Sequence, residues 1–171
     1  MTSAQAGFLA SIFLNTVERE NGTTLRVLKA VPAGKGRYRP DPISRTALDL
    51  SWHIAHSDVW FLDGFLSGNF DMEDDTMPAD IAEGPDVVSW YEDAFPRSFE
   101  TVRKLSPDAW ARELDFFGIY KLPSVMYLQF MLLHTVHHRG QLCAYLRSMG
   151  SKVPNIYGGS FDEPMGEPAE S

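Results

Sequence analysis

Residues 123–149 read PSVMYLQFMLLHTVHHRGQLCAYLRSM, and this stretch decides the fold. Pro123 suits the start of a helix, because its missing N–H is one that the first turn leaves unpaired in any case. From there to Met149 the segment is apolar on nearly every side, as expected of a helix that other elements surround. Gly150 is the expected stop. The stretch therefore predicts one central helix packed against further helices.

Three more helices are predicted ahead of this one, from apolar residues that recur at three- and four-residue spacing. The second begins near Ile43 or Ser44. The third begins at Pro85, where Asp86 places an acid in the first turn, and Pro96 is expected to kink or split it. The predicted ranges are about 4–30, about 43–67 and about 85–105.

The remaining segments are predicted to be connections. PAGKGRYRPDP (32–42) is rich in Pro and Gly and predicts a loop, and SGNFDMEDDTMPAD (67–80) predicts a solvated acidic surface loop. Between 106 and 122, SPDAW indicates a short turn of helix and LDFFGIY an extended or hairpin segment. The sequence thus predicts an all-α chain with a four-helix bundle over 1–157, followed by an irregular tail over 158–171.

Composition restricts the classes of function. With 171 residues, 44% of them hydrophobic, the chain can bury the core of one domain. A net charge of −8 without dense Lys and Arg clusters argues against a nucleic-acid partner. The single cysteine, Cys143, cannot form an internal disulfide. No apolar run has the roughly 20 residues that cross a bilayer, and the N-terminus lacks a secretory pattern. We therefore expect a cytoplasmic protein that does not enter membranes.

All five histidines fall on two of the predicted helices. At about 100° per residue, His134 and His138 lie about 40° apart on one stripe, whereas His137 faces elsewhere. On the second helix, His56 projects into the charged face and His53 lies at its boundary, closer to the core. His53, His134 and His138 could therefore meet inside the bundle and hold a metal ion with a coordination position left open.

Other interpretations of these histidines remain. Imidazoles on an apolar face are often ordinary hydrogen-bonded residues, and then no metal would bind. A structural zinc site is usually closed by a fourth protein ligand. The HExxH pattern of helical metalloproteases is absent, since Thr135 follows His134, so peptidase activity is not expected. A di-iron bundle is disfavoured, because the last helix carries no Glu-x-x-His motif.

The order and spacing of the motifs resemble the DinB/YfiT-like family of metal-dependent bacterial proteins. The resemblance is carried by LSWHIAHSDVWFLDGFLSG (50–68) and by MLLHTVHHRGQLCAYLRSMGSKVPNIYGGSFDEP (131–164). It covers the whole chain in outline. It implies a four-helix bundle with up-down-down-up connectivity and a divalent ion such as zinc, nickel or iron(II), held by three histidines. Matched by position, these ligands are His53, His134 and His138, while His56 and His137 match no family ligand.

Further site residues are predicted around this centre. Asp58 projects onto the apolar face of the second helix, where a carboxylate needs a partner. We predict that it orients a ligand imidazole or accepts a proton. Tyr127, Gln141 and Tyr145 are predicted to border a substrate pocket, and His137 is predicted to pack beside the ligands.

The resemblance leaves the chemistry open, because members of the family include thiol transferases, a mycothiol-dependent isomerase and proteins without an established reaction. Our leading hypothesis is a metal-dependent transferase, similar to thiol S-transferases, or a hydrolase. It would act on a small molecule through a metal-activated thiol or water, and its substrate could include a low-molecular-weight thiol. The alternative is a non-catalytic stress or damage-response bundle with a structural or sensory metal. We also expect a homodimer, formed through an exposed apolar face of the first or last helix.

Overall fold

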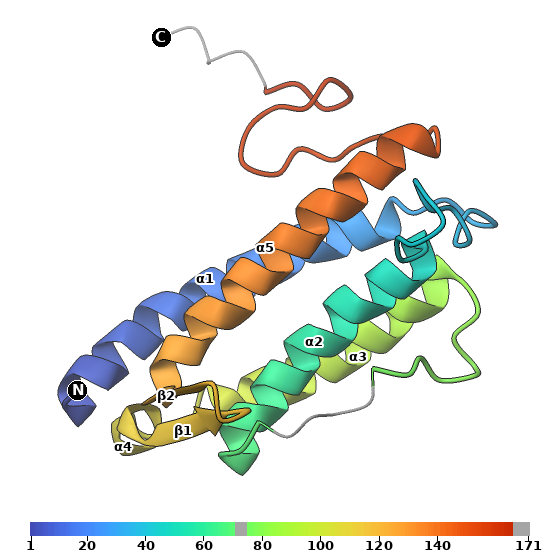
Figure 1. Ribbon diagram of the computed structural model, residues 1–171. Coiled ribbons are helices and arrows are strands. Elements are labelled where there is room, and N and C mark those ends of the chain that lie inside the picture. Colours follow the sequence, from blue (N-terminus) through green and yellow to red (C-terminus); the bar gives the residue numbers. More distant parts are fainter. Residues whose placement is uncertain (71–74, 166–171) are drawn as a thin grey trace, which may run out of the picture.

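The computed structural model describes residues 1–70 and 75–165, which form five helices and one two-stranded hairpin (Figure 1). This confirms the predicted all-α bundle, whose four long helices are α1, α2, α3 and α5. The bounds are α1 Ser3–Lys29, α2 Ala47–Ser67, α3 Gly84–Val102, α4 Pro107–Ala111, β1 Glu113–Phe116, β2 Tyr120–Pro123 and α5 Ser124–Ser148.

The long helices follow the up-down-down-up order: α1 and α5 run in one direction, and α2 and α3 run in the other (Figure 1). Because α2 and α3 are parallel neighbours, the chain between them must return along the length of the bundle. Residues 68–70 and 75–83 are the described parts of this crossover. The crossover brings Asp75 alongside the middle of α2, where Trp52 Nε1 donates a hydrogen bond of 3.1 Å to the Asp75 carbonyl.

Local signals account for most helix ends, with two corrections. The start of α2 lies at Ala47, a few residues after the predicted one, because Thr46 is the N-cap and forms a capping box with Asp49. Pro96 does not split α3, which is one continuous helix. It lies on the exposed side, where the carbonyl that it leaves unpaired can be hydrated. Gly150 adopts a φ of 78°, the left-handed conformation that ends α5 as predicted.

The hairpin closes the end of the bundle where α5 begins. The predicted short helix and hairpin between residues 106 and 122 are confirmed as α4 and as β1 paired with β2 in antiparallel fashion. Tyr127 on α5 is fully buried beneath the hairpin; its hydroxyl donates to the Leu114 carbonyl at 2.9 Å and accepts from the Leu122 N–H at 3.1 Å. An isolated bridge joins Phe70 to Phe116, so the hairpin is also tied to the end of α2.

A buried ion pair fixes α1 against α5. The Arg139 side chain is 1% exposed and lies 2.6 Å from a Glu20 carboxylate oxygen on α1. It also donates to the hydroxyl of Tyr157, which anchors the start of the C-terminal segment. Residues 151–165, which include the first part of the predicted tail, contain no helix or strand, and Asp162 secures them by pairing with Arg147. The rest of the predicted tail, 166–171, lies outside the described residues.

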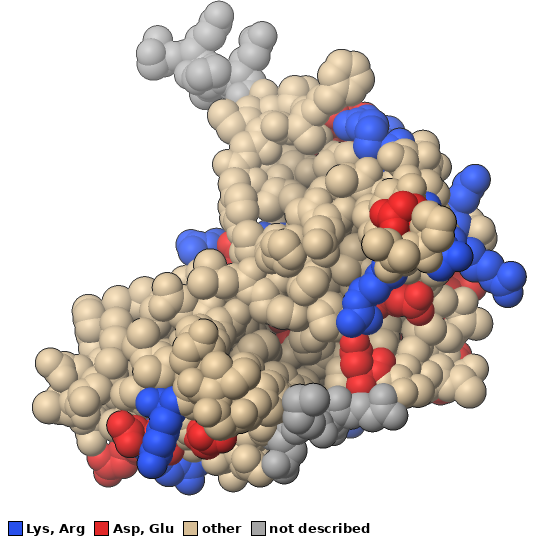
Figure 2. All heavy atoms as spheres, viewed as in Figure 1, with Lys and Arg blue, Asp and Glu red and all other residues tan. Residues whose placement is uncertain are grey.

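On the face drawn in Figure 2, basic and acidic side chains are interspersed toward the two ends, so neither sign of charge dominates this face. Uncharged side chains cover most of the area over α5. Among the described helices, none is long and apolar enough to span a lipid bilayer.

Candidate metal centre

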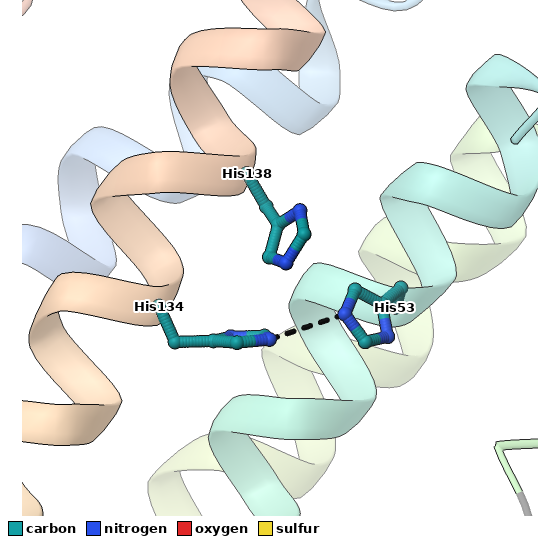
Figure 3. Close-up of side chains that lie close together, drawn as sticks. All are labelled: His53, His134 and His138. Carbon is teal, nitrogen blue, oxygen red and sulfur yellow. Dashed lines mark hydrogen bonds between the residues drawn. The ribbon is translucent and has the colours of Figure 1, made fainter. Parts of the chain in front are cut away.

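Three histidine side chains converge between α2 and α5 (Figure 3). His53 comes from α2, and His134 and His138 come from successive turns of α5. One ring nitrogen of each lies within 4.8 Å of the other two, and Nε2 of His134 is 3.1 Å from Nε2 of His53. The residues singled out in the sequence are therefore brought together, and they could hold a metal ion.

Helix geometry explains why these three meet. Positions i and i+4 lie on one face of a helix, and the ring centroids of His134 and His138 are 4.4 Å apart. Packing of α2 against α5 adds His53, whose ring lies 4.9 Å from that of His134 and 4.6 Å from that of His138. His137 precedes His138 by one residue, so its side chain projects about 100° away from that of His138, and it is exposed.

Asp75 of the crossover holds His53 in place. Its Oδ2 lies 2.8 Å from His53 Nδ1, and its Oδ1 lies 3.4 Å from His56 Nδ1. Burial alone would raise the pKa of Asp75, but hydrogen bonds from His53 and His56 and the charges of His53 and Arg45 outweigh it and hold that pKa well below its usual range. The ionised carboxylate accepts a hydrogen bond from Nδ1–H of His53, so Nε2 of this ring presents its lone pair to the other two histidines.

Gln141 does the same for His138. The Gln141 Oε1 lies 2.8 Å from Nδ1 of His138, so this nitrogen carries the proton and Nε2 carries the lone pair. The amide nitrogen of Gln141 in turn donates to Nε2 of His137 at 3.2 Å. Gln141 and His137 thus form a short chain on the exposed side of α5 that orients one imidazole of the cluster.

His134 is more buried than His138. Burial lowers the pKa of His134 to about 3, and the nearby charges of His138 and His53 lower it in the same direction. Its Nδ1 is buried and has no hydrogen-bond partner among the described residues. Burial is also the largest effect that lowers the pKa of His138, and the charges of His53 and His137 lower it further. The hydrogen bond to Gln141 raises this pKa but does not outweigh them. His134 and His138 therefore favour the neutral form.

This donor set fits a divalent metal ion. Coordination requires neutral imidazoles with available lone pairs, and the partners of His53 and His138 leave Nε2 of both rings pointing into the cluster. Three protein nitrogens leave room for at least one further ligand, which is the arrangement of catalytic rather than closed structural sites.

A pocket of about 250 Å³ adjoins the cluster, and His53 and His134 both line it. Its remaining walls come from α2, from Asp75 and from the hairpin, and are mostly aromatic. The other lining residues are His56, Ser57, Trp60, Phe61, Asp75, Phe116 and Phe117. A small molecule in this pocket would lie against the rings of His53 and His134.

Comparison with known proteins agrees with this architecture. The sequence profile of the DinB family matches residues 3–170. The chain belongs to the DinB family. An uncharacterized protein of Bacillus subtilis, YrdA, is 24% identical over 157 residues, which are 88% of this chain and 89% of YrdA.

Two solved DinB-like structures share the fold. The crystal structure of the Bacillus subtilis DinB-like protein YjoA superposes with a TM-score of 0.66 at 22% identity, over 87% of this chain and 96% of that one. A DinB-like protein of Bacillus cereus gives 0.69 at 23% identity, over 85% and 95%.

Asp58 of this DinB-family chain does not occupy the predicted position beside a ligand imidazole. It lies on another face of α2, 3% exposed, where the Tyr91 hydroxyl donates to Oδ2 at 2.6 Å and the Thr135 hydroxyl contacts Oδ1. Five residues along a helix correspond to a rotation of about 140°, which turns Asp58 toward α3 and away from the side of His53. The carboxylate that orients a ligand is Asp75 instead.

The Thr135 hydroxyl also lies 2.9 Å from the Met131 carbonyl. A hydroxyl carries one hydrogen, so both contacts are satisfied together when Asp58 is protonated and donates to Thr135. Burial, the largest effect, raises the pKa of Asp58 to about 6, although its bonds to Thr135 and Tyr91 and the charge of Arg139 lower it. Asp58 is therefore a buried carboxyl group that links α2, α3 and α5.

The three predicted pocket residues do not line the pocket. Tyr127 is buried under the hairpin, Gln141 bonds to His138 on the exposed side, and Tyr145 packs edge-on against Tyr38 with centroids 5.7 Å apart. Periodicity placed Tyr127 and Tyr145 on the stripe of the ligands and Gln141 close to it, but that stripe is longer than the pocket. Only its central part faces the cavity.

Sequence reasoning missed Asp75, the contact of His56 with it, and the aromatic wall. Asp75 lies in the acidic stretch that we predicted to be a solvated loop, yet its side chain is only 31% exposed and contacts two histidines. Nothing in the sequence distinguishes it from the acids beside it, because only the path of the crossover selects it. The aromatic residues of 115–120 were a detectable signal, since Phe116 and Phe117 are an unusual pair for a turn.

Proposed function

We propose that this DinB-family protein binds a divalent metal ion, zinc, nickel or iron(II), through His53, His134 and His138, and that it is a transferase or hydrolase acting on a small molecule. The observation that carries the proposal is the convergence of three imidazoles beside a pocket that two of them line. A bound ion would supply acidity, lowering the pKa of a coordinated water or thiol.

The residues of the chain supply orientation and proton transfer in this proposal. Asp75 and Gln141 hold the rings of His53 and His138 in their ligand tautomers. The aromatic side chains of the pocket reduce the access of water. We assign the proton-accepting role to His56, which lines the pocket and lies 3.4 Å from Asp75, because that carboxylate would stabilise the imidazolium formed.

The pocket also separates this proposal from its alternative, a non-catalytic bundle with a structural or sensory metal. A purely structural ion needs no adjoining cavity, and such sites are usually closed by a fourth side chain. Residues 1–70 and 75–165 supply three donors to this site, and the space beside them is open to a small molecule. A metal-activated thiol or water fits that space.

The test is metal stoichiometry. Protein purified without a nickel column and stripped with a chelator is dialysed against zinc, nickel or iron(II), and bound metal is measured. We expect one ion per chain, and loss of binding in His53→Ala, His134→Ala and His138→Ala. Leu133→Ala, which changes an exposed residue of the same helix, is the control and should retain the ion. Sub-stoichiometric metal that is the same in His138→Ala as in the unaltered protein would contradict the proposal.

A further inference from the structure

The tip of the hairpin holds a residue that folding alone does not favour there. Phe117 has a φ of 58°, in the left-handed region that glycine and asparagine adopt easily and bulky side chains rarely do. Its side chain is also 37% exposed. The left-handed backbone and the exposed apolar ring of Phe117 both cost stability. Stability therefore does not account for a phenylalanine at this position, which points to a role in function.

The ring of Phe117 forms part of the pocket wall. It lies nearly parallel to Trp60 of α2, with centroids 5.9 Å apart and an angle of 16° between the rings, and it contacts Phe116 with centroids 4.5 Å apart. Phe61 completes the aromatic surface, stacked on Phe116 at 6.2 Å. The left-handed turn at Phe117 thus turns an apolar ring toward the cavity instead of leaving it on the outside of the hairpin.

The pocket has distinct polar and apolar ends. Trp60 follows His53 by seven residues, which is about 10 Å along the axis of α2. His53 and Asp75 therefore mark one end, and the Trp60 and Phe117 pair marks the other. A ligand that fills the pocket needs a polar head of short reach and an apolar body beyond it.

Size and charge narrow the ligand further. A cavity of about 150 Å³ is enough to bind benzene, so about 250 Å³ accommodates a single ring with a short substituent. A larger ligand would extend beyond the pocket into solvent. The described residues that line it include Asp75 but no Lys or Arg, so the walls offer a phosphate or sulfate group no permanently charged partner.

We propose that the pocket takes a compact molecule with one apolar ring, whose ring rests against Phe117 and Trp60 and whose polar head meets His53 and His134, and that Phe117 selects for that ring. The part concerning the head rests on the proposed metal function. The part concerning the ring depends only on the pocket.

Two hydroxamates with the same metal-binding head test the selection of the ring. Benzohydroxamic acid carries a phenyl ring and acetohydroxamic acid a methyl group, and their binding to zinc-loaded protein is compared by calorimetry. We expect the phenyl compound to bind at least about tenfold more tightly, because its ring is removed from water. Equal affinities would overturn the proposal.

Substitution at the hairpin tip separates a ligand-binding role from a structural one. Phe117→Asn should raise the melting temperature, because asparagine adopts the left-handed conformation readily. It should also reduce the ratio of the two hydroxamate affinities toward one. Phe117→Gly serves as a second variant with the same expectation. Ile119→Asn, which removes another exposed apolar residue of the same turn, should keep the preference. A loss of both melting temperature and preference in the Phe117 variants would show a merely structural side chain.

The metal and pocket proposals can fail separately. If dialysis shows no bound zinc, the metal function is rejected, and 4-fluorobenzyl alcohol is then titrated into the metal-free protein by ¹⁹F NMR. Line broadening that disappears in Phe117→Asn would support the pocket without the metal. Zinc binding with equal hydroxamate affinities, or the absence of broadening in the metal-free protein, would reject the ring selection.

Discussion

Replacing Asp58 by asparagine should stabilise the protein near neutral pH. The amide has nearly the shape of the protonated carboxyl group: its oxygen can accept from Tyr91, and its NH₂ can donate to Thr135, whose hydroxyl then donates to the Met131 carbonyl. Unlike Asp58, the amide never has to become a buried anion.

The magnitude follows from the shift of the Asp58 pKa. Burial raises it from 3.8 to about 6, so the folded state holds its proton more tightly than the unfolded chain does. A raised carboxyl pKa contributes stability that is fully present below about 3.8 and is lost as pH rises through 6. Ionisation of Asp58 should therefore reduce the free energy of unfolding by about 2 kcal/mol between pH 4 and pH 7.

Comparing the unaltered protein with Asp58→Asn separates the contribution of Asp58 to the pH dependence of stability from an opposing contribution of His134. The lowered pKa of His134, about 3, contributes stability that is present above its unfolded value near 6.5 and is lost as pH falls. The total pH profile of the unaltered protein therefore combines two slopes of opposite sign. Subtracting the two proteins cancels His134 and leaves the term from Asp58.

The assay is urea unfolding of metal-free protein at a series of pH values from 4 to 7, followed by circular dichroism. The variant should exceed the unaltered protein in free energy of unfolding by about 2 kcal/mol more at pH 7 than at pH 4. Asp63→Asn, an exposed acid on the same helix, is the control and should show no such trend. A difference that stays constant with pH, or an asparagine variant that is less stable at pH 7, would refute a buried protonated Asp58.

Three further predictions concern the metal centre and the core. Asp75→Ala should weaken zinc binding by about 10- to 100-fold, because it removes the acceptor that orients His53; equilibrium dialysis measures this, and the exposed Asp80→Ala in the same crossover should have no effect. Zinc at one hundred times its dissociation constant should stabilise the protein by about 2.7 kcal/mol in thermal unfolding, and the gain should vanish in His138→Ala. Arg139→Met should destabilise the protein by about 3 to 5 kcal/mol in urea, since it leaves the Glu20 carboxylate buried without its partner; a cost under 1 kcal/mol would show that the pair is not a structural link.

Most of the helical architecture could be predicted from local patterns. Apolar periodicity located all four long helices, and the residues 106–122 correctly indicated a short helix and a hairpin. The predictions for α2 and α3 were wrong at points where a capping side chain or exposure to solvent decides the local structure. The start of α2 depends on which residue caps it, and Thr46 does so. The continuity of α3 at Pro96 depends on the side of the helix that faces water.

The candidate site likewise has features that the sequence predicts and features that only the tertiary structure decides. The i, i+4 spacing of His134 and His138 is a property of one helix, so the sequence alone indicated that these rings share a face, and the ring centroids are 4.4 Å apart. Which carboxylate orients His53 could not be read in this way. The helical wheel favoured Asp58 because it projects onto the apolar face of the same helix, whereas the bond comes from Asp75, 22 residues away from His53.

By itself, the sequence determined the helices, the three histidines that they present and the family resemblance, because each of these depends on residues a few positions apart. Only the tertiary structure decided that Asp75 reaches His53, that Asp58 faces Tyr91 and Thr135, and that a hairpin tip closes the pocket with Phe117. These contacts join segments whose separation along the chain carries no periodic signal. They are set by the path of the crossover and by the packing of the hairpin on the bundle.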